Sequence, residues 1–109
     1  MNTNKYFVLI VFILTLVGAG CNLTPHQPKT FSVEIKDMKF VPDIITIDKG
    51  DTIIWINKDM VVHNVTEESA NTWSSGSIAA EGSWKMAVNN KSSYFCSIHT
   101  VMKGKIKLK

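Results

Sequence analysis

The sequence predicts an all-β fold, an antiparallel β-sandwich, and three observations support this prediction. Apolar and polar residues alternate in several short stretches, turn-forming residues separate these stretches, and little of the chain shows a helical period. Many short strands with regular turns are typical of two sheets packed face to face. The chain has 109 residues, so a single folded domain is expected.

The first half of the chain contains three strand-like stretches. The first is residues 31–36, in which Phe31, Val33 and Ile35 share one face. The next two lie within FVPDIITIDKGDTIIWIN, where the turn sequence DKGD joins two β-branched runs. Pro42 is expected at a strand edge or a bulge, because proline has no backbone N–H to donate to a neighbouring strand.

The pattern is weaker in the middle of the second half and then returns. Residues 66–82 are polar and irregular, and a short helical turn over residues 67–71 is one alternative for this segment. Alternation resumes in SWKMAV, with Trp84, Met86 and Val88 on one face. The following NNKSS is a turn signal.

Two further strands are expected near the C-terminus, in SYFCS and in GKIKLK, and the second directs Ile106 and Leu108 inward. The other side of this last strand carries a row of lysines, which is expected to be a solvated edge that discourages strand-to-strand aggregation. The alternative is a docking patch for an acidic partner. The row consists of Lys103, Lys105, Lys107 and Lys109.

The N-terminus has the pattern of a secretory signal peptide over residues 1–20. A polar start with Lys5 precedes an uncharged apolar run, which is shorter than the ~20 residues of a membrane-spanning helix and ends in small residues. GAGC resembles a bacterial lipobox, in which Cys21 becomes the lipidated first residue. The alternatives are a retained anchor helix, or ordinary cleavage after Ala19 that leaves Cys21 as a free thiol.

The segment after the signal peptide, residues 21–30, is expected to be a tether, with His26 solvated, and residues 31–109 form the predicted domain. Removing residues 1–20 leaves 11 of the 12 lysines against 9 acidic residues. This small excess, without any arginine, argues against nucleic-acid binding.

Cys96 needs an explanation in an exported protein, because cysteines in oxidising compartments are usually paired. One alternative is a disulfide bond with Cys21. The other is a metal site, since Cys96, His99 and Met102 are three sulfur or nitrogen donors within seven residues. His63 follows the apolar TIIWIN stretch, and strand ends meet at one pole of a sandwich. We therefore expect His63 to face this loop.

The donor types favour copper. A Cys-x-x-His spacing alone is weak evidence, because zinc sites share it, but a thioether is a poor zinc ligand. Iron in an oxygenase requires a carboxylate and open positions. Two histidines and a cysteine with a weakly bound axial methionine are typical of blue-copper electron-transfer sites. Bound metal also keeps the cysteine as a thiolate, which explains why Cys96 is unpaired.

Two blocks of the chain resemble the cupredoxins, in particular the amicyanin and plastocyanin branch. The blocks are FVPDIITIDKGDTIIWINKDMVVHNV and YFCSIHTVMKGKI, and the resemblance extends over residues 31–109. Two differences are visible: Ile98 stands where the family usually has proline before the second histidine, and Thr100 stands where amicyanin has proline. These differences suggest a more flexible loop.

The resemblance implies an eight-stranded Greek-key sandwich with one copper ion at a pole. It implies that His63, Cys96 and His99 are the equatorial ligands and that Met102 is the axial ligand. It also implies that Asn64 joins the two ligand loops by hydrogen bonding. Rival axial donors are Met60 and Met86, although neither lies in the ligand loop.

Together these observations predict an exported type 1 blue-copper protein that carries single electrons between a donor and an acceptor protein, which dock transiently near His99. We expect a monomer in the periplasm or on the outer face of a bacterial membrane, anchored by lipid at Cys21. The alternative is a copper storage or delivery protein with the same ligands. An enzyme is disfavoured because the chain has no spare ligands for a second metal centre, and an adhesion module leaves the Cys96, His99 and Met102 spacing unexplained.

Overall fold

A computed structural model describes residues 24–109 of the chain. The predicted signal peptide, residues 1–20, and the predicted lipidation site, Cys21, lie outside the described residues. Within residues 24–109, no helix has the length and apolar character needed to cross a membrane.

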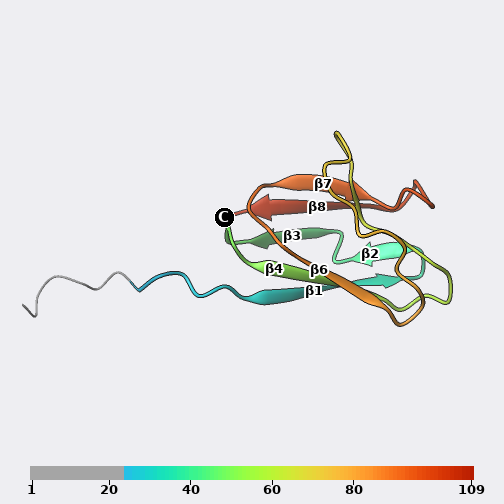
Figure 1. The fold of residues 1–109 in the computed structure, drawn as a ribbon, viewed down its shortest axis with the longest axis horizontal. Helices are drawn as coiled ribbons and strands as arrows, with labels where there is room; N and C mark the ends of the chain where they lie inside the picture. Colours follow the sequence, from blue (N-terminus) through green and yellow to red (C-terminus); the bar gives the residue numbers. More distant parts are fainter. Residues whose placement is uncertain (1–23) are drawn as a thin grey trace, which may run out of the picture.

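Eight strands form two four-stranded sheets that pack face to face (Figure 1). One sheet has the strand order β2-β1-β4-β6 and the other has the order β3-β8-β7-β5. The prediction of an all-β, eight-stranded Greek-key sandwich is therefore confirmed. The strands are β1 (Thr30–Lys36), β2 (Lys39–Val41), β3 (Ile44–Ile47), β4 (Thr52–Asn57), β5 (Thr66–Glu67), β6 (Ser83–Ala87), β7 (Ser92–Phe95) and β8 (Lys103–Leu108).

The prediction that all pairings are antiparallel is wrong for two pairs. Strand β1 runs parallel to β4, with Val33 opposite Trp55, and β3 runs parallel to β8, with Ile45 opposite Ile106. The chain moves from one sheet to the other between β2 and β3 and returns before β4. Alternation of side chains reports which face is buried, but both strand directions have the same alternation.

The middle of the chain contains a turn where a helical turn was one alternative. Residues 68–70 form a turn after the short strand β5. The side chain of Glu67 holds this turn, because its carboxylate accepts hydrogen bonds from the backbone N–H of Ser69 at 2.9 Å and of Ala70 at 2.8 Å. Local side-chain hydrogen bonds of this kind compete with helix formation.

The core lies between the two sheets and follows the predicted alternation. Val33, Ile35 and Ile106 are almost completely buried, while Phe31 and Leu108 are partly buried against the same core. Trp55 occupies the centre, with its ring 5.5 Å from the rings of both Trp84 and Tyr94. Residues 30–108 supply all the strands and the whole buried core of the described chain.

The sandwich has two distinct poles. The loop pole carries the β1–β2 turn, the segment after β4 and the loop between β7 and β8 (Figure 1). The terminal pole carries the β3–β4 and β6–β7 turns, the point where residues 24–29 join the domain, and the C-terminus. Backbone hydrogen bonds join these segments, among them Gly50 N–H to Val88 at 2.7 Å and Thr52 N–H to Lys29 at 2.8 Å.

A buried carboxylate organises the terminal pole. Asp51 accepts hydrogen bonds from the backbone N–H groups of Lys29 and Asp48, both at 3.0 Å, and from Nε2 of His26 at 2.8 Å. His26 is exposed as expected, with 41% of its side chain accessible, but its contact with Asp51 was not predicted. The alternation of apolar and polar residues predicts strands only. It therefore gives no sign that His26, before the first strand, contacts Asp51, 25 positions later.

Asp51 is expected to make stability depend on pH. The Lys29 N–H, opposed by burial and assisted by His26 and Asp48, lowers the pKa of Asp51 from 3.8 to about 2. A carboxyl with a lowered pKa in the folded state contributes stability that is present above the unfolded pKa and is lost as pH falls toward the folded pKa. Asp51→Asn should therefore reduce stability most above about pH 5, and the difference from the wild type should shrink by about pH 2.

Chemical denaturation across this pH range measures the effect, with Asp43→Asn at an exposed carboxyl as the control. A difference between the Asp51 variant and the wild type that does not change with pH would contradict the assignment.

A second prediction concerns Gly104, which is covered by the Tyr94 ring and has no room for a side chain. The two residues are opposite each other in the β7–β8 pair, and a Cβ at position 104 would lie 2.2 Å from Cζ of the buried Tyr94. Gly104→Ala should destabilise the protein by about 1–3 kcal/mol through overpacking. The exposed Lys105→Ala on the same strand should stay within about 0.5 kcal/mol of the wild type in the same unfolding experiment. Equal stability of the two variants would rule out the overpacking argument.

Candidate metal centre

Three predicted donors meet at the loop pole. Sγ of Cys96 lies 3.9 Å from Nδ1 of His63 and 3.8 Å from Nδ1 of His99, and the two Nδ1 atoms are 3.2 Å apart. His63 follows β4 in one sheet, whereas Cys96 and His99 follow β7 in the other. The site therefore forms where the segment that crosses from β4 to β5 meets the loop that follows β7.

The donors differ in their exposure. His63 and Cys96 are completely buried, and Cys96 is a free thiol, whereas His99 is partly exposed. Met102 is also buried, at 2% exposure, and the backbone ties it to the other donors: Cys96 N–H donates to the Met102 carbonyl at 3.1 Å, and Met102 N–H donates to the His99 carbonyl at 3.0 Å. These bonds close residues 96–102 into a tight loop.

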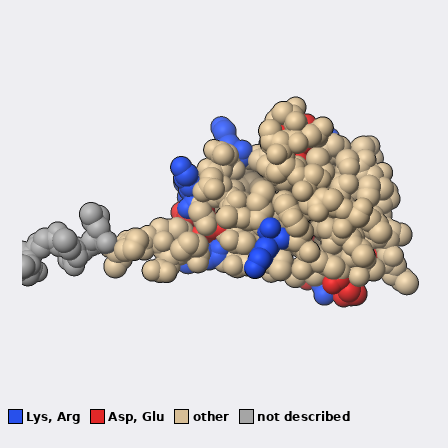
Figure 2. Space-filling model, in the orientation of Figure 1, with Lys and Arg blue, Asp and Glu red and all other residues tan. Residues whose placement is uncertain are grey.

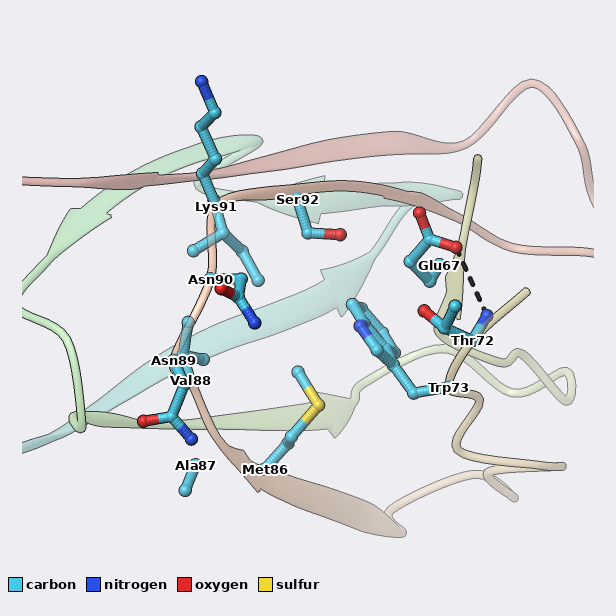
Figure 3. A pocket seen from close by; sticks show the side chains of 11 residues that line it. Glu67, Thr72, Trp73, Met86, Ala87, Val88, Asn89, Asn90, Lys91 and Ser92 are labelled. Atoms are coloured by element: carbon cyan, nitrogen blue, oxygen red, sulfur yellow. Dashed lines mark hydrogen bonds between the residues drawn. The ribbon is translucent and has the colours of Figure 1, made fainter. Parts of the chain in front are cut away.

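The rival methionines lie in different environments from Met102. Met60 is 95% exposed, so its side chain is largely in solvent. Met86 lies on β6 and lines a hollow beside Glu67, Trp73 and Lys91 (Figure 3). Glu67 is not a free ligand there, because its two carboxylate oxygens accept hydrogen bonds from the backbone N–H groups of Ser69 and Ala70.

Asn64 connects the two loops that carry the donors. Its side-chain Nδ2 donates to Oγ of Ser97 at 2.7 Å, and its Oδ1 accepts from the Ser97 N–H at 2.8 Å and from Oγ1 of Thr66 at 3.1 Å. Its backbone N–H also lies 3.4 Å from Sγ of Cys96, in the position of a hydrogen bond to sulfur. These contacts fix the cysteine loop relative to the segment after β4.

Asp59 orients His63, and no pattern in the sequence predicted this role. Nε2 of His63 lies 2.8 Å from Oδ2 of Asp59, and because a carboxylate only accepts, Nε2 carries the proton. The Nδ1 lone pair of a neutral His63 is then directed at Cys96 and His99, as a metal ligand requires.

Two residues of the β1–β2 turn hold Asp59 in place by hydrogen bonds. Asp37 and Met38 both have positive φ, 53° and 61°, and their N–H groups donate to Asp59 at 2.7 and 3.0 Å. Burial raises the pKa of Asp59, but the hydrogen bonds from Met38, His63 and Asp37 outweigh burial and lower it below 3.8. Only the D-x-x-x-H spacing of Asp59 and His63 was visible in the sequence, and such spacing carries no information in a loop.

The donor set fits copper. Two imidazole nitrogens and one sulfur face one another, and a buried thioether residue belongs to the same loop. Among residues 24–109, the other group of three potential ligands is His26, Asp48 and Asp51 at the terminal pole. In that group, backbone N–H groups and His26 already occupy the Asp51 oxygens.

Comparison with known proteins agrees with this fit. Residues 28–109 match the copper-binding proteins of the plastocyanin/azurin family. Amicyanin of Paracoccus versutus is 28% identical over 80 residues, which cover 68% of this chain, and the match spans only 61% of the length of that relative.

Solved amicyanin structures have the same fold. A methionine-to-alanine variant in the Cu(I) form superposes with a TM-score of 0.68 at 22% identity, covering 73% of this chain and 82% of that chain. An oxidised proline-to-alanine variant gives a TM-score of 0.68 at 23% identity over the same shares of the two chains.

The two-sheet fold and the soft donor set at one pole define a cupredoxin, a β-sandwich copper protein. More narrowly, the chain belongs to the plastocyanin/azurin family of copper-binding proteins, and its cofactor is copper.

Asn64→Ala should loosen the site. The change leaves the Ser97 N–H without its acceptor, which is expected to cost roughly 1–3 kcal/mol of stability. It should also speed copper loss to a chelator, because the two ligand loops are no longer joined. The exposed Asn89→Ala is the control. Unfolding curves and the rate of copper release measure both effects, and unchanged release from the Asn64 variant would remove its connecting role.

Proposed function

We propose that this protein is an exported one-electron carrier with a type 1 copper site. In this proposal His63, Cys96 and His99 are the equatorial ligands and Met102 is the axial ligand. The observation that supports it best is the mutual approach of one Sγ and two Nδ1 atoms, all within 4.8 Å of one another. Copper bound there supplies one-electron chemistry, by alternating between Cu(II) and Cu(I).

The chain holds the donors in place before the metal arrives. Asp59 orients the imidazole of His63, and Asn64 fixes the loop that carries Cys96. A donor set held in this way suits both oxidation states moderately well, so little has to move when an electron is transferred. This property favours a carrier over a storage protein, which needs a site that opens to release its metal.

The partly exposed His99 is the proposed point of electron entry and exit. Exposed apolar side chains neighbour the donors in sequence: Ile98 is 50% and Val101 84% exposed on the Cys96 loop, and Val61 is 48% and Val62 41% exposed beside His63. Apolar residues at the loop pole suit transient docking of a donor and an acceptor protein. Ile98, where the family usually has proline, adds to this apolar surface.

The cellular setting belongs to the same proposal. Residues 1–20 act as a signal peptide, Cys21 carries the lipid, and residues 21–30 tether a monomeric domain, residues 31–109. The support is the sequence pattern of a signal peptide followed by GAGC. The protein would then work in the periplasm or on the outer face of a bacterial membrane.

Loading with Cu(II) should produce an intense visible band from sulfur-to-copper charge transfer, together with the paramagnetic-resonance spectrum of a type 1 site. Cys96→Ser should abolish the band while the far-UV circular dichroism of the sandwich is retained. Cys21→Ser should keep the band and serves as the matched cysteine control. A coloured Cys96→Ser protein would disprove the assignment. A reversible potential with fast self-exchange distinguishes a carrier from a copper store.

Met102→Gln should retain copper but lower the reduction potential, because an amide oxygen stabilises Cu(II) more than a thioether does. Met60→Gln changes an exposed thioether and should leave the potential unchanged. Voltammetry of the two variants makes the comparison. If the potential is the same in Met102→Gln as in the wild type, Met102 is not a ligand.

A further inference from the structure

Positive charge collects at the terminal pole, far from the proposed copper site. Figure 2 shows lysine side chains gathered at the end of the molecule where the N-terminal segment joins the sandwich. The carboxylates in the same segments are Asp48 and the completely buried Asp51. The lysines, all exposed, are Lys29, Lys49, Lys91, Lys107 and Lys109.

The topology brings these lysines together from four separate segments. Lys29 precedes β1, Lys49 lies in the β3–β4 turn, Lys91 lies in the β6–β7 turn, and Lys107 and Lys109 end the chain. Backbone hydrogen bonds join the segments, including Lys109 N–H to Ile47 at 3.0 Å. Of these five lysines, only Lys109 has an ion-pair partner among residues 24–109, namely Asp48 at 3.8 Å.

The loop pole does not share this excess. Its lysines are balanced in number by carboxylates in the same turns, and one of these carboxylates, Asp59, is committed to His63. The molecule is therefore electrically asymmetric along its long direction. The balanced set at the loop pole is Lys36, Lys39, Lys58 and Lys103 against Asp37, Asp59, Glu81 and Glu68, the last of which forms an ion pair with Lys103.

The N-terminal segment is fixed at the basic pole. His26 and the Lys29 N–H both bind Asp51, so the chain leaves the domain at the pole that carries these lysines. Cys21 precedes His26 by only five residues, which span at most ~18 Å when extended. A lipid on Cys21 would hold the terminal pole near the bilayer, close to the ~8–10 Å range over which charges act at physiological salt.

We propose that the terminal pole docks on an anionic bilayer surface, so that the loop pole with its copper site faces away from the membrane. The proposal rests on the membrane attachment at Cys21 proposed above. Charge complementarity supplies the contact, since each lysine close to an anionic surface strengthens binding roughly fivefold. Docking orients the anchored domain and leaves His99 accessible to partner proteins.

Lysine acetylation of the mature lipidated protein, residues 21–109, on vesicles tests the orientation. Vesicles of phosphatidylglycerol and phosphatidylcholine are compared with vesicles of phosphatidylcholine alone, and mass spectrometry maps the modified lysines. On the anionic vesicles, Lys49, Lys91 and Lys107 should be protected several-fold, and about 0.5 M salt should remove the protection. Lys36 and Lys58 should react equally on both vesicle types. Equal modification of Lys49, Lys91 and Lys107 on the two vesicle types would overturn the proposal, as would protection of the loop pole.

A charge-reversed pair of variants gives an independent measurement. Lys91→Glu combined with Lys107→Glu should weaken the salt-sensitive part of vesicle binding at least tenfold. Lys36→Glu combined with Lys58→Glu, at the loop pole, has the same net charge and should retain it. If both variants lose binding equally, net charge alone acts and the docking surface is refuted. If neither loses it, the lipid at Cys21 alone accounts for binding and the proposal also fails.

The visible copper band separates this proposal from the proposed function. A colourless protein whose terminal pole is still protected would remove the electron-carrier proposal and leave the docking surface in place. A coloured protein without protection would do the reverse. An acidic protein partner in place of lipid would appear as absence of protection on both vesicle types, which counts against the proposal.

Discussion

The hydrogen bonds between Asn64 and Ser97 join the segment that leads from β4 to β5 with the loop that follows β7, and the metal centre depends on this junction. His63 arrives from the β4 side and Cys96 from the β7 side, 33 positions apart in sequence. The β5–β7 pairing ends at Thr66 and Phe95, so strand hydrogen bonds stop just short of the donors. The paired hydrogen bonds between Asn64 and Ser97 therefore fix the relative positions of the two donor segments, which core packing alone would not fix.

Below this junction, a second set of contacts fixes the direction of one donor. Asp59 accepts hydrogen bonds from His63 and from two N–H groups of the β1–β2 turn, whose residues adopt unfavourable positive φ angles. The arrangement stabilises a strained turn and an oriented imidazole with the same carboxylate. It shows how a small domain, with a modest core, can hold a rigid metal site at its edge.

The two poles of the sandwich suit different kinds of contact. The loop pole combines buried donors with exposed apolar side chains such as Val101, which suits brief contact with other proteins. The terminal pole combines a pinned N-terminal segment with exposed lysines, which suits a charged surface. Because the strands run between the poles, the chain can be attached at one end without obstructing the other.

The sequence by itself determined the burial pattern and the donor types that gather at one pole, because both are expressed in neighbouring residues: alternation in β4 and β8, and the Cys96–His99–Met102 spacing. The eight-stranded sandwich was expected from the resemblance. The tertiary structure alone decided the parallel β1–β4 and β3–β8 pairings, the Asp59–His63 contact, the Asp51–His26 contact and the gathering of lysines at one pole. These features join residues through space, and hydrogen bonds between loops leave no periodic signal along the chain. The local sequence pattern specifies which side chains a segment buries, whereas the topology of the sandwich decides which other segments those side chains contact.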